Sequence, residues 1–226
     1  KRRPTSVHEA SADEEEFNRD NREMMQETEH MDAHFVIGEE KVPAHKSILT
    51  ARAEYFKALF RKDAEFRDSK ECLISVDANT FTTQHIRWVL DFIYTNRVQD
   101  ICDVNTDDLL FLLHLADQWL LRDLKRLVEH ELIRSHMSVE TVARLYGATE
   151  EFHAKRLSRA CIDFIMNNLR QLAGNANFED EMKQYPHLCI PVLKAAADLI
   201  PEPAQKKQRR HAPSAPSTAD PAGSSP

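Results

Sequence analysis

The sequence predicts an α+β protein, in which a small β-sheet flanked by α-helices is followed by an all-helical extension. Strand-like and helix-like segments alternate in the N-terminal part, whereas only helical periodicity continues from Thr106 onward. Hydrophobic residues make up 42% of the 226 positions, which is enough to bury one ordinary core or two small ones. The ordered part of the chain is predicted to run from about Met31 to Ile200.

The two ends differ in composition from this ordered part. Residues 1–30 are charged and poor in apolar side chains, which predicts a disordered arm. Phe17, Met24 and Met31 recur at seven-residue intervals, so a short docked helix within the arm stays open as an alternative. Residues 201–226 hold six of the ten prolines, mixed with Ala and Ser, and this predicts a disordered tail.

The first ordered elements are predicted to form a β-hairpin and a helix. HFVI is followed by a turn at Gly38-Glu39 and by EKVPAH, whose Pro43 restricts the second strand to a sheet edge or to its own end. Ser47 or Thr50 is expected to cap the helix that follows. The apolar positions of this helix include Ala53, Phe56 and Phe60.

After a charged loop, CLISV is typical of a short strand, and an amphipathic helix is predicted next. Its apolar stripe comprises Ile86, Val89, Leu90, Ile93 and Tyr94. Asp107 and Asp108 bring negative charge to the first turn of the helix LLFLLHLADQWLL, where the helix dipole favours it. Three further helices are predicted, one through Leu124, Leu127, Val128 and Leu132, and two within SVETVARLYGA and HAKRLSRACIDFIMNNLRQL.

Composition argues against several functional classes. The formal net charge is −7, so no overall field attracts nucleic acid or an anionic membrane surface. Apolar runs are too short and too interrupted by charge to span a bilayer, and no secretory signal is recognised, so we expect a soluble intracellular protein. The chain has four glycines and neither GxGxxG nor GxxxxGK, which argues against a phosphate-cradling loop and a bound cofactor.

The cysteines do not predict a metal site. Cys72, Cys102, Cys161 and Cys189 lie far apart, without CxxC spacing and without a histidine at a ligand interval. Their apolar neighbours instead predict buried, reduced thiols in a reducing compartment. We therefore predict no catalytic, cofactor-binding or metal-binding residues, and we expect the protein not to be an enzyme.

The stretch VPAHKSILTARAEYFKALF, from Val42 to Phe60, resembles the signature stretch of BTB/POZ domains. Asp32 ahead of FVI, the strand CLISV, the segment VLDFIYTNRV and the helical pair LLHLADQWLLRDLKRLVEHEL match the family in the same order. The continuation VETVARLYGATEEFHAKRLSRACIDFIMNNL resembles the start of the helical BACK extension. Among BTB proteins, the chain looks most like those that carry armadillo or ankyrin repeats.

The resemblance implies a fold and a division into domains. We expect a BTB/POZ fold over residues 31–133 and a BACK-like helical extension over residues 134–200, between the arm of residues 1–30 and the tail of residues 201–226. The residues expected in the core are Val36, Ile48, Phe56, Leu90, Ile93, Leu112 and Leu127.

The resemblance also implies binding rather than catalysis. BTB domains generally form homodimers, and many of those with BACK extensions recruit the N-terminal domain of cullin-3, so that a further module can deliver a substrate protein for ubiquitin transfer. We therefore expect a homodimerising adaptor of a cullin-3 RING ubiquitin ligase. The alternative is an oligomerising scaffold or transcription-associated interaction domain that does not bind cullin.

Candidate cullin-binding residues follow from the family pattern of a hydrophobic residue, any residue and Glu after the signature helix. The aligned loop offers Phe66 and Asp68, with Asp in place of Glu. Trp119 stands where the family often has a Tyr that contributes to the cullin surface, and Tyr55 is expected near it. Trp119 fits an interface anchor and an inward-packed core residue equally well.

Three further residues match family positions at the dimer axis. Asp32 and Lys46 correspond to the acidic and basic positions of a charged pocket, although Lys46 also fits an ordinary exposed lysine. His45 lacks a nearby nucleophile and is expected to hydrogen-bond locally at the strand-to-helix junction.

The C-terminal tail contains the basic run KKQRRH. A nuclear import signal is one interpretation of this run, and a chance cluster is the other. The residues concerned are Lys206, Lys207, Arg209 and Arg210. The expected location is therefore the cytoplasm, with the nucleus as an alternative.

Overall fold

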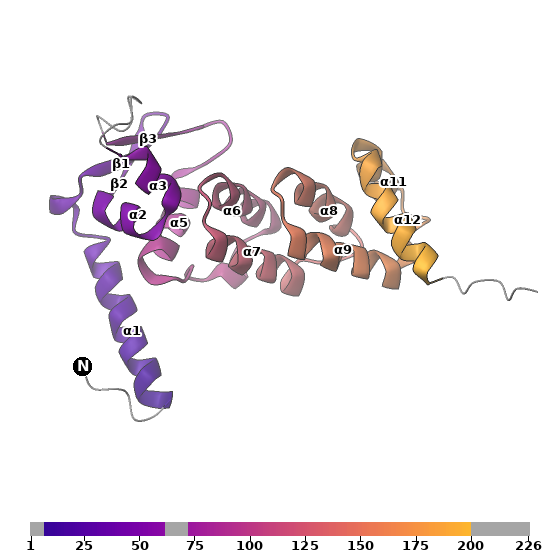
Figure 1. Cartoon of the computed structure of the whole chain (residues 1–226), viewed down its shortest axis with the longest axis horizontal. Coiled ribbons are helices and arrows are strands. Elements are labelled where there is room, and N and C mark those ends of the chain that lie inside the picture. The colour runs from indigo at the N-terminus through magenta and orange to yellow at the C-terminus, as the bar shows by residue number, and fades with distance from the viewer. Residues whose placement is uncertain (1–6, 62–71, 200–226) are drawn as a thin grey trace, which may run out of the picture.

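The computed structural model describes residues 7–61 and 72–199, and side chains from residue 13 onward. Within these ranges a small sheet lies at one end and helical hairpins extend from it in a row, while helix α1 (Val7–Met24) projects from the sheet end (Figure 1). The α+β class with an all-helical extension is thus confirmed.

Strands β1 (Ala33–Ile37), β2 (Glu40–Ala44) and β3 (Leu73–Val76) form the sheet in the order β2-β1-β3. β1 and β2 form the predicted antiparallel hairpin, and the turn uses Gly38 with φ +60°, a conformation that glycine adopts without a steric penalty. Pro43 lies on β2, an edge strand, as predicted, because proline has no N–H to donate to a further strand. The central strand β1 buries Ala33, Phe35 and Ile37 on one face.

β1 and β3 pair in parallel, and this pairing requires a crossover between them. Helices α2 (Lys46–Arg52) and α3 (Glu54–Leu59) lie in this crossover. The prediction of one helix here, capped by Ser47 or Thr50, is wrong. Extended backbone at Ala53 (φ −137°, ψ 125°) separates the two helices, and His45 is the N-cap residue of α2.

Helix α5 (Thr83–Thr95) packs against β2, α2 and the helix that follows it. Every residue of its predicted apolar stripe is buried, which confirms the periodicity. Helix α6 (Thr106–Gln118) begins after Asn105, whose side chain accepts a hydrogen bond from the backbone N–H of Asp108. Asp107 and Asp108 occupy the first turn of α6, as predicted.

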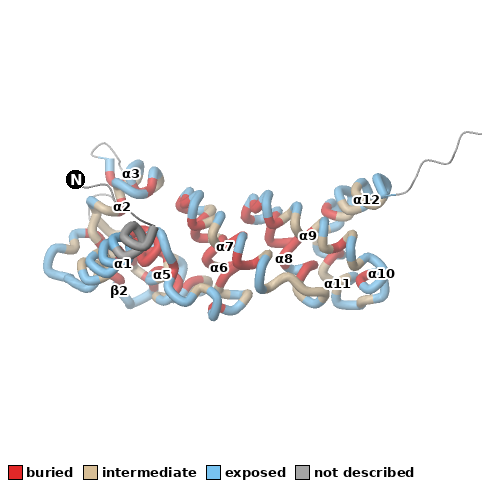
Figure 2. The backbone as a smooth tube through the Cα atoms, turned by 90° about the horizontal axis from the view of Figure 1, so that it is seen from below, coloured by how far each residue is buried: buried red, intermediate tan, exposed pale blue. Residues whose placement is uncertain are grey.

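The remaining helices form stacked hairpins. α6 packs on α7 (Arg122–Ser135), and α8 (Val142–Glu151) packs on α9 (Lys155–Asn167). After α10 (Leu169–Leu172), α11 (Ala176–Gln184) packs on α8 and α12 (Cys189–Asp198) packs on α9. Buried segments follow one another along the row from α6 to α9 (Figure 2). Three 3₁₀ turns complete the described elements: η1 (Thr28–His30), η2 (Ile101–Asp103) and η3 (Pro186–Leu188).

Helix α1 lies where the sequence predicted a disordered arm. The seven-residue spacing that suggested a docked helix does not mark its inner face, because Phe17 is 60% exposed whereas Asn18 is buried. Only the C-terminal part of α1 reaches the core, through the half-buried Met24 and the following Met25. Helix α1 packs on α5, and the ion pair of Arg22 with Asp91 of α5 joins residues that lie far apart in the sequence.

The predicted core is confirmed in part. Four of the seven predicted residues are buried, namely Phe56, Leu90, Ile93 and Leu112. Three are only half-buried, namely Val36, Ile48 and Leu127. Val36 alternates with the buried residues of β1, so it points to the other face of the sheet.

All four cysteines are free thiols, but they are not uniformly buried. Cys161 is buried, Cys72 and Cys189 are half-buried, and Cys102 is exposed. Burial raises the pKa of the Cys161 thiol to about 12, so this thiol stays protonated at neutral pH. The prediction of buried thiols is thus wrong for Cys102, which lies in the surface turn η2.

Candidate interaction surface

Trp119 is a core residue of the sheet end. Its ring lies 5.3 Å from the rings of Phe35 and Phe56, centroid to centroid, and only 2% of the residue is exposed. Tyr55 borders this cluster, with its ring 5.2 Å from that of Phe56 and 6.5 Å from that of Trp119. The structure therefore favours the inward-packed interpretation of Trp119 over a surface anchor, because a tryptophan this deeply buried presents no side chain to a partner.

The residue after Trp119 points the other way. Leu120 lies in the α6–α7 turn with φ +56°, and it is 63% exposed. The N–H of Leu120 donates to the carbonyl of Asp117, and the N–H of Leu121 donates to that of Ala116. This is the Schellman pattern that ends many helices, with a leucine at the left-handed position that usually holds glycine. The turn thus keeps Trp119 inside and presents an apolar side chain to solvent.

Leu120 lines a groove of about 910 Å³, which we call the α3–α7 groove. The groove lies beside the break between α2 and α3, the end of α5 and the start of α7. Its lining comprises Arg52, Ala53, Glu54, Phe92, Asn96, Leu120, Leu121, Arg122, Asp123, Arg126, Leu127 and His130.

The charged side chains of the α3–α7 groove are mostly basic. Arg52 is held in place by hydrogen bonds to the carbonyl of Ile93 and to Asn96. Arg126 pairs with Asp123 at 3.3 Å, and three arginines against two acids give the lining a formal excess of one positive charge, in a chain of net charge −7. An apolar side chain beside the held guanidinium of Arg52 suits a partner surface that combines apolar and acidic groups.

His45 has the architectural role that the sequence predicted, but through a partner distant in sequence. Its backbone N–H donates to the hydroxyl of Tyr94 at 3.0 Å, and its Nδ1 lies 2.7 Å from the same oxygen. Burial raises the pKa of Tyr94, so its hydroxyl stays protonated at neutral pH. His45 therefore ties the start of α2 to α5.

Asp32 and Lys46 are brought together, although not as an ion pair of side chains. The carboxylate of Asp32 accepts a hydrogen bond from the backbone N–H of Lys46 at 2.7 Å, and thereby satisfies a free donor at the start of α2. The ammonium group of Lys46 lies 3.5 Å from the sulfur of Cys72 and 4.9 Å from the ring centroid of Phe60. Whether these residues line a dimer pocket stays a prediction.

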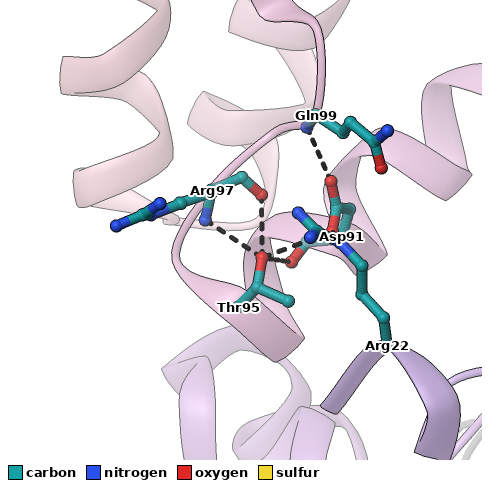
Figure 3. A network of polar contacts seen from close by, with 5 residues as sticks. All are labelled: Arg22, Asp91, Thr95, Arg97 and Gln99. Atoms are coloured by element: carbon teal, nitrogen blue, oxygen red, sulfur yellow. Dashed lines mark hydrogen bonds and ion pairs between the residues drawn. The ribbon is translucent and has the colours of Figure 1, made fainter. Parts of the chain in front are cut away.

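A buried carboxylate fastens α1 to α5 (Figure 3). Asp91 is 6% exposed and accepts hydrogen bonds from Nε of Arg22 at 3.1 Å and from the backbone N–H of Gln99 at 2.7 Å. Thr95 donates to the carbonyl of Asp91 and accepts from the N–H of Arg97. A second, exposed ion pair joins Arg97 to Glu14 of α1 at 2.8 Å.

Several predicted residues lie outside the described part of the chain. These are the cullin-binding candidates Phe66 and Asp68 and the basic residues Lys206, Lys207, Arg209 and Arg210. Among the described residues, no group of three or more His, Cys, Asp or Glu side chains could hold a metal ion. The described helices also include none with the length and apolarity needed to cross a bilayer.

A family model described as the BTB/POZ domain matches residues 21–136, which is more than half of the chain. The chain belongs to the BTB/POZ family. BTB domains mediate self-association and protein binding, so this BTB chain is a protein-interaction module.

Similar proteins include two from Arabidopsis thaliana and one from Drosophila melanogaster. The "ARM repeat protein interacting with ABF2" is 31% identical over 63% of this chain and 19% of its own length. The "Armadillo BTB Arabidopsis protein 1" is 27% identical over 77% of this chain and 22% of its own length. The Drosophila "BTB/POZ domain-containing protein 9" is 24% identical over 74% of this chain and 22% of its own length. The chain thus spans about a fifth of the length of these relatives.

Solved structures similar to the chain include two BTB domains. That of human gigaxonin matches 57% of this chain and 94% of its own, with 23% identity and a TM-score of 0.40. That of zebrafish PATZ1 matches 59% of this chain and all of its own, with 25% identity and a TM-score of 0.41.

Sequence reasoning missed two features of this surface. In the run Trp119-Leu120-Leu121, helical periodicity cannot place all three side chains inside, and this is the only local sign of an exposed leucine. The contact of Arg22 with Asp91 joins residues 69 positions apart, and no local pattern indicates it.

Proposed function

We propose that this BTB chain is a homodimerising substrate adaptor of a cullin-3 RING ubiquitin ligase, in which α8–α12 form a BACK-like extension. The observation that carries the proposal is Leu120, an exposed leucine in left-handed backbone at the edge of the α3–α7 groove. Such a conformation costs a non-glycine residue about 1–2 kcal/mol. Strain of this kind is concentrated where a side chain serves recognition.

The location of the groove supports a cullin partner. α3, which borders it, ends at Leu59, seven residues before Phe66 in the sequence. Leu120 and Phe66 are therefore proposed as the two apolar anchors of one interface. Burying Leu120 on a partner contributes about 1.5–3 kcal/mol, and the arginines of the groove attract acidic side chains at its rim.

The Asp at position 68 favours a second candidate function. Family members that bind cullin usually have Glu here, and Asp is shorter by one methylene group. Under this alternative the chain is an oligomerising scaffold, and Leu120 contacts a different protein. The two functions differ in one measurable property, namely affinity for the cullin-3 N-terminal domain.

Isothermal titration of the chain with the cullin-3 N-terminal domain tests the adaptor function. We expect Phe66→Ala to abolish binding, Leu120→Ser to raise the Kd about tenfold, and Asp68→Glu to preserve or strengthen binding. Leu193→Ser is the matched control, because Leu193 is 66% exposed, like Leu120 at 63%, but lies in α12 at the other end of the row. If neither the unmodified chain nor Asp68→Glu binds, the scaffold function replaces the adaptor function.

Self-association is the second part of the proposal. Symmetric dimers are the commonest oligomers, and α1 carries the exposed Phe17 on a helix that projects from the body. We expect sedimentation equilibrium to give a dimer mass at micromolar concentrations and Phe17→Ser to weaken it. If the unmodified chain has the mass of a monomer at tens of micromolar, self-association is contradicted. The cullin titration would still test the adaptor function.

A further inference from the structure

Helix α12 closes the row of hairpins and is apolar on two sides. Of its ten residues only Lys194 and Asp198 are charged, yet none of the ten is buried. In contrast, α6 carries three aspartates and buries six residues. A helix with so little polar surface is normally covered all round.

The two apolar sides of α12 differ in what covers them. Cys189 and Val192 are half-buried against the core and border a groove beside α10 and α11. Ile190 and Leu193 are 55% and 66% exposed, and Leu199 just beyond the helix is 67% exposed. Figure 2 shows α12 at the end of the row in the colours of exposed and half-buried residues. The outer side is thus an apolar surface facing solvent.

This surface continues into a groove of about 550 Å³ between α10, α11 and α12. Leu172 and Met182 form its buried floor, and Phe178, Val192 and Leu193 form its apolar walls. Helices α11 and α12 supply most of its lining, as in the grooves between helices that receive an amphipathic helix.

The charges around the groove indicate the chemistry of its occupant. Lys183 pairs with Asp180 at 2.8 Å, and Lys194 formally balances Asp198. Glu179 and Lys183 both line the groove, and Glu181 lies beside it; with Asp180, α11 has three acids against one lysine and so a formal net charge of −2. A second copy of the chain would bring the same acids against them, whereas a basic helix would neutralise them.

We propose that the groove between α10, α11 and α12 binds an amphipathic α-helix of a partner protein that carries lysine or arginine beside its apolar stripe. The apolar stripe covers Leu193 in the groove and extends over the exposed Ile190 next to it on α12. The basic residues face Glu179, which lines the groove, and Glu181 at its edge. This site lies in the helical extension, away from the α3–α7 groove, and does not depend on cullin binding.

Fluorescence anisotropy with a labelled peptide of about 18 residues tests the proposal, because helix-in-groove recognition is read by anchors at i, i+3, i+4 and i+7. The probe has leucines at these positions and lysines on both flanks. One control peptide carries glutamate in place of lysine, and another has the same composition with its leucines distributed around the helix. The full chain is titrated in each case.

We expect the basic amphipathic peptide to bind, and Leu193→Ser to raise its Kd by about tenfold or more. Glu179→Gln should raise the Kd about threefold at low salt and have less effect at high salt, where exposed charges are screened. Leu120→Ser replaces a similarly exposed leucine at the other end of the molecule and should leave the Kd of the peptide unchanged. Because both leucines are exposed, neither change should unfold the chain, and circular dichroism checks this.

Three results would overturn the proposal. The first is equal binding of the acidic or the distributed-leucine peptide, and the second is an unchanged Kd in Leu193→Ser. The third is concentration-dependent self-association that Leu193→Ser removes, since that would make a second copy the occupant. If the chain binds the peptide but not cullin, the adaptor function alone is refuted. If it binds cullin but not the peptide, only the site between α10, α11 and α12 is refuted.

Discussion

Replacing Asp91 with alanine tests how α1 is held on the BTB domain. The change removes the acceptor of two short hydrogen bonds, from the backbone N–H of Gln99 at 2.7 Å and from Arg22 at 3.1 Å, and of a longer one from the Thr95 hydroxyl at 3.3 Å. Hydrogen bonds to a charged group contribute about 1.5–3 kcal/mol each. The two short bonds together would contribute about 3–6 kcal/mol. Arg22 is one-third exposed and is hydrated again when its partner is lost, so the expected loss lies in the lower half of that range. We expect the free energy of unfolding to fall by about 3–4 kcal/mol.

Two variants separate the parts of this effect. Asp91→Asn keeps an oxygen for the N–H of Gln99 but loses the charge that faces Arg22, so we expect a loss of about 1–2 kcal/mol. Glu14→Ala breaks the exposed pair with Arg97, whose side chains are 59% and 52% exposed, and should cost about 0.5 kcal/mol or less.

Urea unfolding followed by circular dichroism gives these free energies, and hydrogen exchange of α1 reports its release directly. A double-mutant cycle of Arg22→Ala with Asp91→Ala should give a coupling energy of at least about 1 kcal/mol. The reasoning is refuted if Asp91→Ala costs no more than Glu14→Ala, because burial of the carboxylate would then make no difference.

Two substitutions and one chemical labelling test the α6–α7 turn, the burial of the cysteines and the packing of α8. Leu120→Gly should raise the free energy of unfolding by up to about 1 kcal/mol in urea titrations, since glycine adopts φ +56° without strain; a loss of stability would contradict a strained turn. Iodoacetamide at mildly alkaline pH should alkylate the exposed Cys102 and leave Cys161, whose thiol has a pKa of about 12, unmodified in peptide mass spectra. Equal labelling of both would disprove the burial of Cys161. Gly147→Ala would place a Cβ 2.5 Å from the ring of Tyr185 and should lower the free energy of unfolding by about 1–3 kcal/mol. Tyr185→Leu should recover part of that loss, and no recovery would show that the clash lies elsewhere.

Local chemistry made much of the fold predictable. The backbone of Pro43 cannot donate a hydrogen bond, which favoured an edge position for its strand. The apolar stripe from Ile86 to Tyr94 predicted which face of α5 is buried in the core. The break at Ala53 was missed, because alanine favours helix and only tertiary packing selects the extended backbone there.

The candidate surface was less predictable than the fold. Trp119 and Leu120 are adjacent apolar residues, yet Trp119 is buried and Leu120 is exposed. This difference depends on the positive φ of Leu120, which leucine rarely adopts. The helix α1 sits in a charged segment whose composition favours disorder, and it is fastened by Asp91, which is far from it in sequence. Both features depend on contacts that form only after the rest of the fold is in place.

The parallel pairing of β1 with β3 also has a kinetic consequence. His34 pairs with Leu73, so this ladder closes a long loop, whereas α6 and α7 meet through a turn of a few residues. Loop-closure entropy must be overcome before such distant pairs gain contact energy, so structures rich in local contacts form faster. The helical hairpins should therefore condense early and the sheet should close late. Mutations that weaken β1–β3 pairing would then mainly speed unfolding, while equally destabilising changes in the α6–α7 hairpin would slow refolding.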